Sequence, residues 1–108
     1  MALEYKIEED SQGKVSTIFF SGRFKFRDHD TFFEIVDMIK YRTRAIDSKV
    51  VFDFSELEFL DSAALGMLVI VHDEAAAKDV YLVIKGAKGK VKDVLYAARF
   101  DTLYGFVD

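Results

Sequence analysis

The chain has 108 residues, of which 51 % are hydrophobic, with a net charge of −4 and no cysteine. This length is typical of a single domain, and the absence of cysteine excludes disulfides, thiolate metal sites and cysteine nucleophiles. Lysine and arginine are scattered among acidic residues, which argues against the basic face of a nucleic-acid-binding protein.

The first ten residues lack the basic stretch and the apolar run of a signal peptide. The longest nearly uninterrupted apolar run, residues 63–71, is far shorter than the roughly 20 residues of a membrane span. Secreted domains of this size are usually cross-linked by disulfides. We therefore expect a cytoplasmic protein with no direct insertion into a membrane.

The first part of the sequence predicts a β-hairpin followed by a helix. Residues 3–8 alternate apolar and polar side chains, and residues 15–20 are rich in β-branched and aromatic residues, with turn-forming residues in between. Thr31 and Glu34 have the spacing of a capping box, which satisfies free amides at a helix start. Apolar residues follow at helical spacing, so we expect this helix to continue to about residue 44.

The second part alternates strands with helices. Residues 49–54 form an apolar run suited to a strand buried on both faces, and a loop is expected at residues 55–60. A helix, a strand, a helix and a short last strand are then expected at residues 63–78, 80–84, 90–99 and 103–107. Such alternation predicts right-handed crossovers and parallel strands. The fold class is therefore α/β, with an N-terminal hairpin, a mixed central sheet of four or five strands and helices packed against it.

Ser62 is the candidate functional residue with the most informative surroundings. It follows Asp61 at the predicted start of a helix that comes after a buried strand. In open α/β sheets, ligands bind at the carboxyl ends of the strands, and the free amides of a helix start favour an anion. A phosphoserine there would add about −1.5 to −2 charges. From the residue types alone, however, a helix cap worth roughly 1 kcal/mol explains this Asp-Ser pair better.

The segment around Ser62 resembles the signature of the STAS domain family (sulfate transporter and anti-sigma factor antagonist). That family typically shows a buried strand ending in Asp, a short hydrophobic loop, and then Asp-Ser-Ser/Ala-Gly/Ala-Leu-Gly. Here residues 50–54 supply the strand and residues 61–66 read DSAALG, with Ala63 and Ala64 where many members have Ser and Gly. The resemblance covers the whole chain in element order and is specific over residues 53–68.

The resemblance implies a non-enzymatic switch protein without a cofactor or a metal. In the anti-sigma factor antagonist branch, the phosphorylated Ser directly follows the Asp, which corresponds to Ser62. A serine kinase that doubles as an anti-sigma-type sequestering protein binds the unphosphorylated form and loses its grip on the product. A metal-dependent serine phosphatase restores the binding form. Asp61 would orient the hydroxyl or cap the helix, and Asp53 would lie near the loop leaving the strand; plain structural roles are an equal alternative for both.

The helix after Ser62 is apolar around most of its circumference, so part of it is a candidate partner-binding face. The residues expected to contact the partner are Asp53, Asp61, Ala63, Ala64, Gly66 and Met67. Exposure is expected near Ala64, Met67, Leu68 or Val71, with the alternative that a neighbouring element covers them. The protein itself is expected to be a monomer or a weak dimer.

Other functions are possible alternatives to this switch. A second use of the same fold is a stable accessory subunit that docks on a membrane transport ATPase, with Ser62 as a structural contact. His29 lies between acidic residues, but no second imidazole or thiolate stands at ligand spacing. The sequence positions no base for a serine hydrolase. Phe24 and Phe26 are flanked by basic residues and are the phenylalanines expected to be most exposed.

Overall fold

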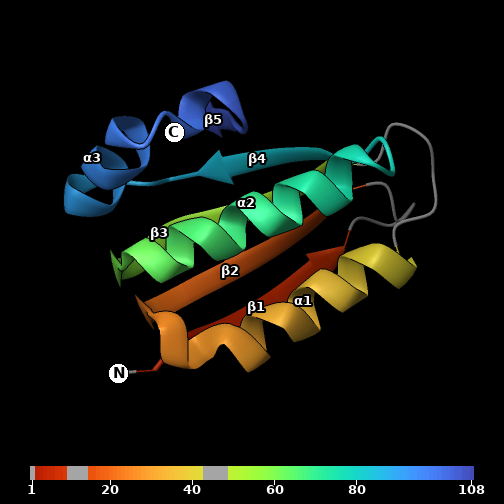
Figure 1. Cartoon of the computed structure of the whole chain (residues 1–108), viewed down its shortest axis with the longest axis horizontal. Coiled ribbons are helices and arrows are strands. Elements are labelled where there is room, and N and C mark those ends of the chain that lie inside the picture. Colours follow the sequence, from red (N-terminus) through yellow and green to blue (C-terminus); the bar gives the residue numbers. More distant parts are fainter. Residues whose placement is uncertain (1, 10–14, 43–48) are drawn as a thin grey trace.

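The computed structural model describes residues 2–9, 15–42 and 49–108, which form five strands and three α-helices (Figure 1). The elements in chain order are β1 (Glu4–Glu9), β2 (Val15–Phe24), the 3-10 helix η1 (Phe26–Asp28), α1 (His29–Arg42), β3 (Lys49–Leu60), α2 (Ser62–Ala76), β4 (Tyr81–Lys85), α3 (Gly89–Ala97), the 3-10 helix η2 (Phe100–Thr102) and β5 (Gly105–Val107). The turn of the hairpin and the expected helix end near residue 44 lie outside the described residues. None of the helices in the described ranges is long and apolar enough to cross a membrane.

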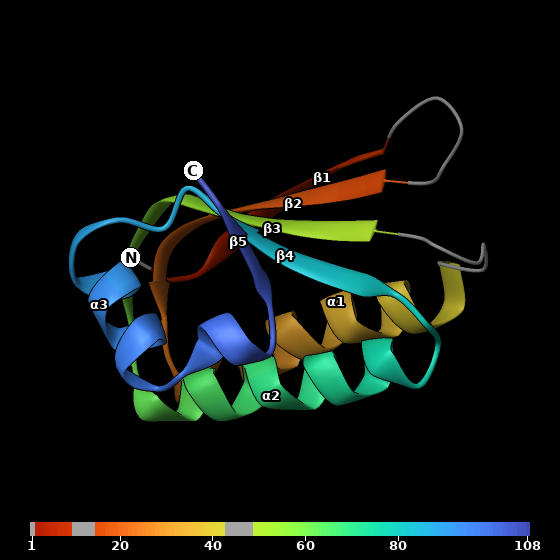
Figure 2. The same cartoon turned by 90° about the horizontal axis from the view of Figure 1, so that it is seen from above.

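The strands form one sheet in the order β1-β2-β3-β4-β5. β1 is antiparallel to β2, whereas β2, β3, β4 and β5 are parallel to their neighbours, so the predicted hairpin and mixed sheet are confirmed. Right-handed crossovers that always step in the same direction place their helices on the same face of a sheet. Accordingly, α1 and α2 lie side by side beneath the sheet (Figure 2).

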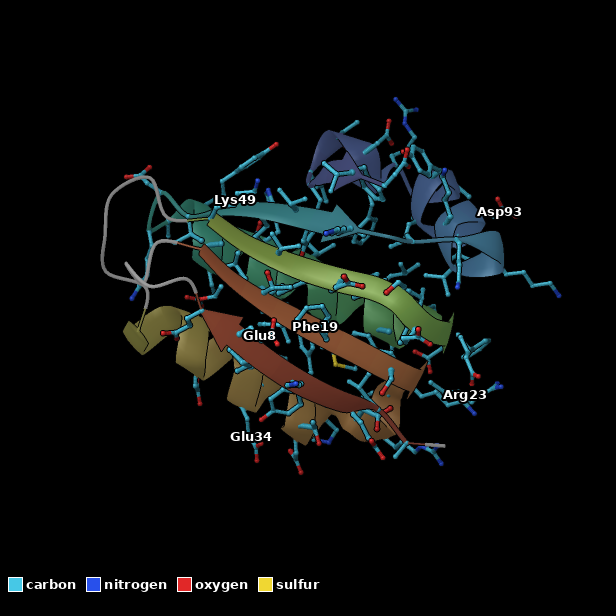
Figure 3. All side chains as sticks on the ribbon, turned by 180° about the vertical axis from the view of Figure 1, so that it is seen from behind. Glu8, Phe19, Arg23, Glu34, Lys49 and Asp93 are labelled. Carbon is cyan, nitrogen blue, oxygen red and sulfur yellow. The ribbon has the colours of Figure 1, made fainter. Side chains whose placement is uncertain are left out.

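The core fills the space between the sheet and these two helices, and phenylalanine rings form much of it. The alternation of β2 points Phe20 inward, where its ring centroid lies 5.4 Å from that of Phe52 on β3. Phe32 of α1 packs edge-on to Phe52 at 6.5 Å. Phe19 points to the opposite face of the sheet, which Figure 3 shows from behind.

The third strand is longer than the sequence suggested. The loop expected at residues 55–60 is wrong, because β3 continues to Leu60 and its additional residues pair with β2. The register between the two strands shifts twice, and Gly22 beside the second shift has a φ of +88°, which glycine adopts without steric cost. β3 therefore carries the chain to the start of α2 with only one residue between them.

The first helix also begins differently from the prediction. α1 starts at His29, directly after η1. The prediction that Thr31 and Glu34 form a capping box at the helix start is therefore wrong. The buried carboxylate of Asp28 instead accepts hydrogen bonds from the backbone N–H groups of Lys25 (2.9 Å) and Leu3 (3.3 Å). It thereby satisfies two amides at the end of β2 and at the start of the chain.

Candidate functional site

Asp61 is the N-cap of α2. Its backbone is extended (φ −99°, ψ 178°), and its carboxylate oxygen Oδ1 accepts a hydrogen bond from the N–H of Ala64 at 2.8 Å. Its carbonyl oxygen accepts the first bond of the helix from Leu65 at 3.2 Å. Because the first four amides of a helix have no partner within it, this side chain fixes where α2 begins.

The same residue joins α2 to the end of β2. The second carboxylate oxygen of Asp61, Oδ2, accepts a hydrogen bond from the N–H of Phe26 at 3.1 Å. The N–H of Asp61 donates to the carbonyl of Phe24 at 3.1 Å. Both oxygens of Asp61 thus bind backbone amides, which favours the capping role predicted for it over orientation of a hydroxyl.

Ser62 is the first residue of α2, and its side chain is exposed. The neighbouring cap leaves the amides of Ser62 and Ala63 at the positive end of the helix dipole. An anion attached to Ser62 is therefore compatible with the helix, because it would sit where negative charge is favourable.

Two cations near this end of the sheet were not recognised in the sequence as members of the site. The guanidinium carbon of Arg23 lies 4.4 Å from the centroid of the Phe59 ring, and the ammonium of Lys25 lies 5.6 Å from it. Lys25 is also the residue between Phe24 and Phe26, which both bind Asp61. The signal in the sequence was the alternation of basic and aromatic residues at 23–27. The ring that both cations contact, that of Phe59, comes from a segment expected to be a loop.

Asp53 lies apart from Ser62. Because β3 extends to Leu60, Asp53 is in the middle of the strand, and its expected position beside a loop is wrong. It is buried and accepts hydrogen bonds from the N–H (2.9 Å) and the hydroxyl (2.5 Å) of Ser55. At about 3.3 Å per residue, the strand separates Asp53 from Asp61 by roughly 25 Å.

The exposed patch expected on α2 is wrong in its members. Ala64, Met67, Leu68 and Val71 are buried, because they face the sheet and α1. Of the other residues expected at the partner surface, Ala63 is half-buried and Gly66 is exposed. The large apolar side chains that α2 exposes are Val69 and Ile70.

An apolar groove lies between α1 and α2, beginning one residue after Ser62. It has a volume of about 360 Å³, and its lining is formed by Phe26, His29, Phe33, Ala63, Gly66, Met67 and Ile70. We call it the α1–α2 groove. Phe26 is 66 % exposed at its rim and packs against the imidazole of His29 at 5.3 Å between centroids. The predicted exposure of Phe26 is thus confirmed, whereas Phe24 is fully buried and that prediction was wrong.

The C-terminal part of the chain also contacts α2. The hydroxyl of Tyr104, which is buried, donates a hydrogen bond to the carbonyl of Leu68 at 2.7 Å. Burial, and secondarily the charge of Asp73, raises the pKa of Tyr104 well above its usual value of 10.0. The hydroxyl therefore stays protonated throughout the neutral range, and this contact opposes folding only when alkali ionises it.

Replacing Asp61 by Ala should loosen the start of α2. We expect Asp61→Ala to lower the free energy of unfolding by about 1–2 kcal/mol, because it removes the cap and the partner of Phe26. Urea unfolding measures the loss, and hydrogen exchange should show it first at the amides of Ala64 and Phe26. Asp61→Asn keeps one acceptor for the cap, so its free energy of unfolding should lie between those of the native protein and of Asp61→Ala. An unchanged midpoint for Asp61→Ala would contradict this account of the cap.

Residues 6–106 match the family model of the STAS domain. The chain therefore belongs to the STAS domain family. It is similar to a STAS-domain containing protein of Pseudomonas aeruginosa (strain UCBPP-PA14), with 28 % identity over 94 residues that cover 87 % of this chain and 89 % of the relative. The resemblance found in the sequence is therefore confirmed.

Solved structures show the same fold at low sequence identity. The anti-sigma factor antagonist SpoIIAA in its unphosphorylated form aligns with a TM-score of 0.72 and 13 % identity, over 97 % of this chain and 88 % of that chain. The phosphorylated form of SpoIIAA, from Bacillus, aligns with a TM-score of 0.71 and 11 % identity, over 97 % and 92 % of the two chains. A sulfate transporter family protein from Wolinella succinogenes aligns with a TM-score of 0.71 and 15 % identity, over 93 % and 85 %.

Within the described ranges, no three His, Cys, Asp or Glu side chains are grouped so that they could hold a metal ion. His29 has a carboxylate neighbour, with its Nδ1 3.0 Å from Oδ1 of Asp30, but among the described residues no third ligating side chain joins this pair. The described residues of the site are an exposed hydroxyl at Ser62, the helix cap at Asp61 and the apolar groove that begins at Ala63.

Proposed function

We propose that this protein is a phosphorylation-controlled protein-binding switch of the anti-sigma factor antagonist type. Ser62 is the residue that carries the phosphate. The unphosphorylated protein binds its partner through the surface around Ser62, and the phosphorylated protein is released. STAS domains of this kind typically act as binding modules, and we assign this chain no enzymatic activity of its own.

The observation that carries the proposal is the position of Ser62, exposed at the start of α2 and adjacent to the α1–α2 groove. A phosphate can be added there without unfolding, because the hydroxyl is accessible and the helix start favours negative charge. The added charge would stand at the edge of an apolar surface, where a docked partner excludes water and an unpaired charge is costly.

The proposed cycle needs two further proteins. A serine kinase, which doubles as an anti-sigma-type sequestering protein, binds the unphosphorylated form and phosphorylates Ser62. A metal-dependent serine phosphatase reverses the modification. We place this cycle in the cytoplasm and propose no contact with nucleic acid. Of the residues predicted for partner binding, we keep Ala63, Gly66 and Met67, which line the groove, and regard Asp61 and Ala64 as supports for the helix start.

The proposal is tested by mapping phosphate on the protein purified from its native host. Intact mass and peptide fragmentation should show one phosphate on Ser62 under some growth or stress conditions, and none in the Ser62→Ala variant. Loss of the added mass on incubation with a metal-dependent phosphatase would link the modification to the cycle. If Ser62 carries no phosphate in any condition, the switch is the wrong function.

A second candidate function is supported by the structural similarity to the sulfate transporter family protein. In this case the chain is an accessory subunit that docks stably on a membrane transport ATPase, and Ser62 is an ordinary contact. One measurable difference separates the two functions: a stable subunit should remain bound in every growth condition, whereas a switch should exchange its partner.

A further inference from the structure

Lys25 lies beside the start of α2 and has no carboxylate partner. Its ammonium is 5.6 Å from the centroid of the Phe59 ring, and none of the ion pairs among the described residues includes it. We propose that Lys25 is the receptor of a phosphate on Ser62: after phosphorylation its ammonium leaves the ring and binds the phosphate oxygens of its own chain. This inference rests on the proposed function and names the residue that holds the phosphate in the modified form.

The backbone brings Lys25 next to the start of α2. The hydrogen bonds between β2 and β3 continue past the last paired residues, because the N–H of Asp61 donates to the carbonyl of Phe24 at 3.1 Å. The N–H of Phe26 donates to the carboxylate of the same Asp61, also at 3.1 Å. Lys25 stands between these two residues, so it lies beside Asp61 at the spacing of about 5 Å that separates neighbouring strands.

A phosphate on Ser62 is within reach of this ammonium. One further residue along the chain adds about 3.8 Å, so the Cα atoms of Lys25 and Ser62 are at most roughly 9 Å apart. An extended lysine side chain spans about 6 Å and a phosphoserine side chain about 4–5 Å, so the two groups can meet. In a helix the Cα–Cβ bond tilts toward the N-terminus, which directs the side chain of Ser62 toward the helix start, where Lys25 lies.

The ammonium loses little when it leaves the ring. A cation–π contact with an exposed ring is weak, and Phe59 is 36 % exposed. A hydrogen bond from an ammonium to a phosphate is charge-assisted, and the flexible stem and three rotatable donors of lysine allow it to form. Arg23 lies two residues earlier on β2, and its guanidinium carbon is closer to the same ring, at 4.4 Å. We therefore expect Arg23 to stay on Phe59.

The acidic side chains around this site leave the ammonium available to a phosphate. Those at the end of β3, in η1 and in the first turn of α1 are Asp28, Asp30, Glu56, Glu58 and Asp61. Asp28 and both oxygens of Asp61 accept hydrogen bonds from backbone amides, and Asp30 pairs with the imidazole of its neighbour. Glu56 and Glu58 are exposed, and no ion pair within the described ranges joins either of them to Lys25.

Binding of the phosphate by Lys25 changes the surface at Phe59 as well. In the unmodified protein two cations lie over this ring. When the ammonium of Lys25 moves to Ser62, the guanidinium of Arg23 remains and more of the ring faces solvent. A phosphate carries about −1.5 to −2 charges, so one ammonium leaves the start of α2 negative. The phosphorylated form therefore differs from the unmodified form in two places, at Ser62 and at Phe59.

Full-length protein with phosphoserine incorporated at position 62 tests the proposal. Phosphorus NMR at 0.1 M salt, where distant charges are screened, gives the pH midpoint at which this phosphate takes its second negative charge. A nearby ammonium favours the doubly charged form and lowers the midpoint. We expect the midpoint of Lys25→Gln to lie about 0.5–1 pH unit above that of the protein with Lys25. The helix start acts equally on both proteins and cancels in this comparison.

Two further variants remove the same charge at other positions. Arg23→Gln removes the second cation on the Phe59 ring, and we expect it to raise the midpoint by less than half as much as Lys25→Gln. Lys49→Gln should leave the midpoint unchanged, because Lys49 lies at the opposite end of the sheet from Arg23 (Figure 3). The signals of the Phe59 ring should also move when phosphatase removes the phosphate, and should move by less than half as much in Lys25→Gln.

An unchanged midpoint in Lys25→Gln, or an equal rise in Arg23→Gln, would overturn the proposal. A rise in Arg27→Gln in place of Lys25→Gln would overturn it in favour of Arg27, which is exposed in η1. The phosphoserine is incorporated during synthesis, so none of these outcomes depends on whether the native host phosphorylates Ser62. A failure of this inference is therefore distinguishable from a failure of the proposed function.

Discussion

Ser62→Asp should lose the partner that Ser62→Ala retains. We expect the Asp variant to bind the partner on the order of 100-fold more weakly than the native protein, and the Ala variant to bind within about threefold of it. The reason is that the docked partner excludes water from a charge at the edge of an apolar contact and supplies no opposite charge of its own, which typically costs 2–5 kcal/mol. The Ala variant only removes an exposed hydroxyl.

The measurement is quantitative capture from the native host, with each variant used as bait. Ala98→Asp is a matched control, because it adds the same charge at an exposed position at the end of α3. It should capture the partner as well as the native protein does. If Ser62→Ala and Ser62→Asp weaken capture equally, Ser62 is a structural contact, as the transport-subunit function requires.

The largest effect on stability is expected from Phe52→Ala. Phe52 is 0 % exposed on the central strand and packs against Phe20, Phe32 and Phe54 at centroid distances of 5.4, 6.5 and 6.3 Å. Truncating such a ring removes its transfer free energy and leaves a cavity, which costs about 3–5 kcal/mol. This is a large share of the roughly 5–15 kcal/mol that holds a typical domain folded.

Phe19→Ala is the matched control for this prediction. Phe19 lies one position from Phe20 on β2, but its side chain is 37 % exposed on the other face of the sheet. We expect it to cost less than about 1 kcal/mol, since little burial is lost. Urea unfolding of the two variants at 25 °C gives the comparison. Similar losses for Phe19→Ala and Phe52→Ala would mean that the core is not where the structure places it.

The order of elements followed from periodicity, but the extent of β3 did not. Residues 49–54 read as a strand because they are uniformly apolar, whereas Ser55, Glu56 and Glu58 resemble a loop. In the structure these residues pair with β2 through two shifts of register, and Leu57 and Leu60 are buried in the core. Pairing of this kind depends on a partner strand distant in the sequence, so local propensity does not report it.

The sequence motif located the start of α2, but it did not predict which side chains form the surface around it. Asp61 and Ser62 were placed correctly at the helix start, because capping is a local property. The exposed side of α2 was misjudged because its apolar residues surround the helix, and only the positions of the sheet and α1 decide which are covered. The role of Phe26 in the groove was also hidden, since four of the residues that line the groove with it belong to α2, about 40 residues later in the sequence.

The central claim is that phosphate on Ser62 controls partner binding. The most direct measurement is the affinity of protein that carries phosphoserine at position 62 for the partner captured by Ser62→Ala. The affinity is measured before and after this protein is treated with phosphatase. We expect the dephosphorylated protein to bind on the order of 100-fold more tightly, the same ratio predicted for the substitutions. Equal affinities of the two forms would contradict the switch and leave the stable-subunit function in its place.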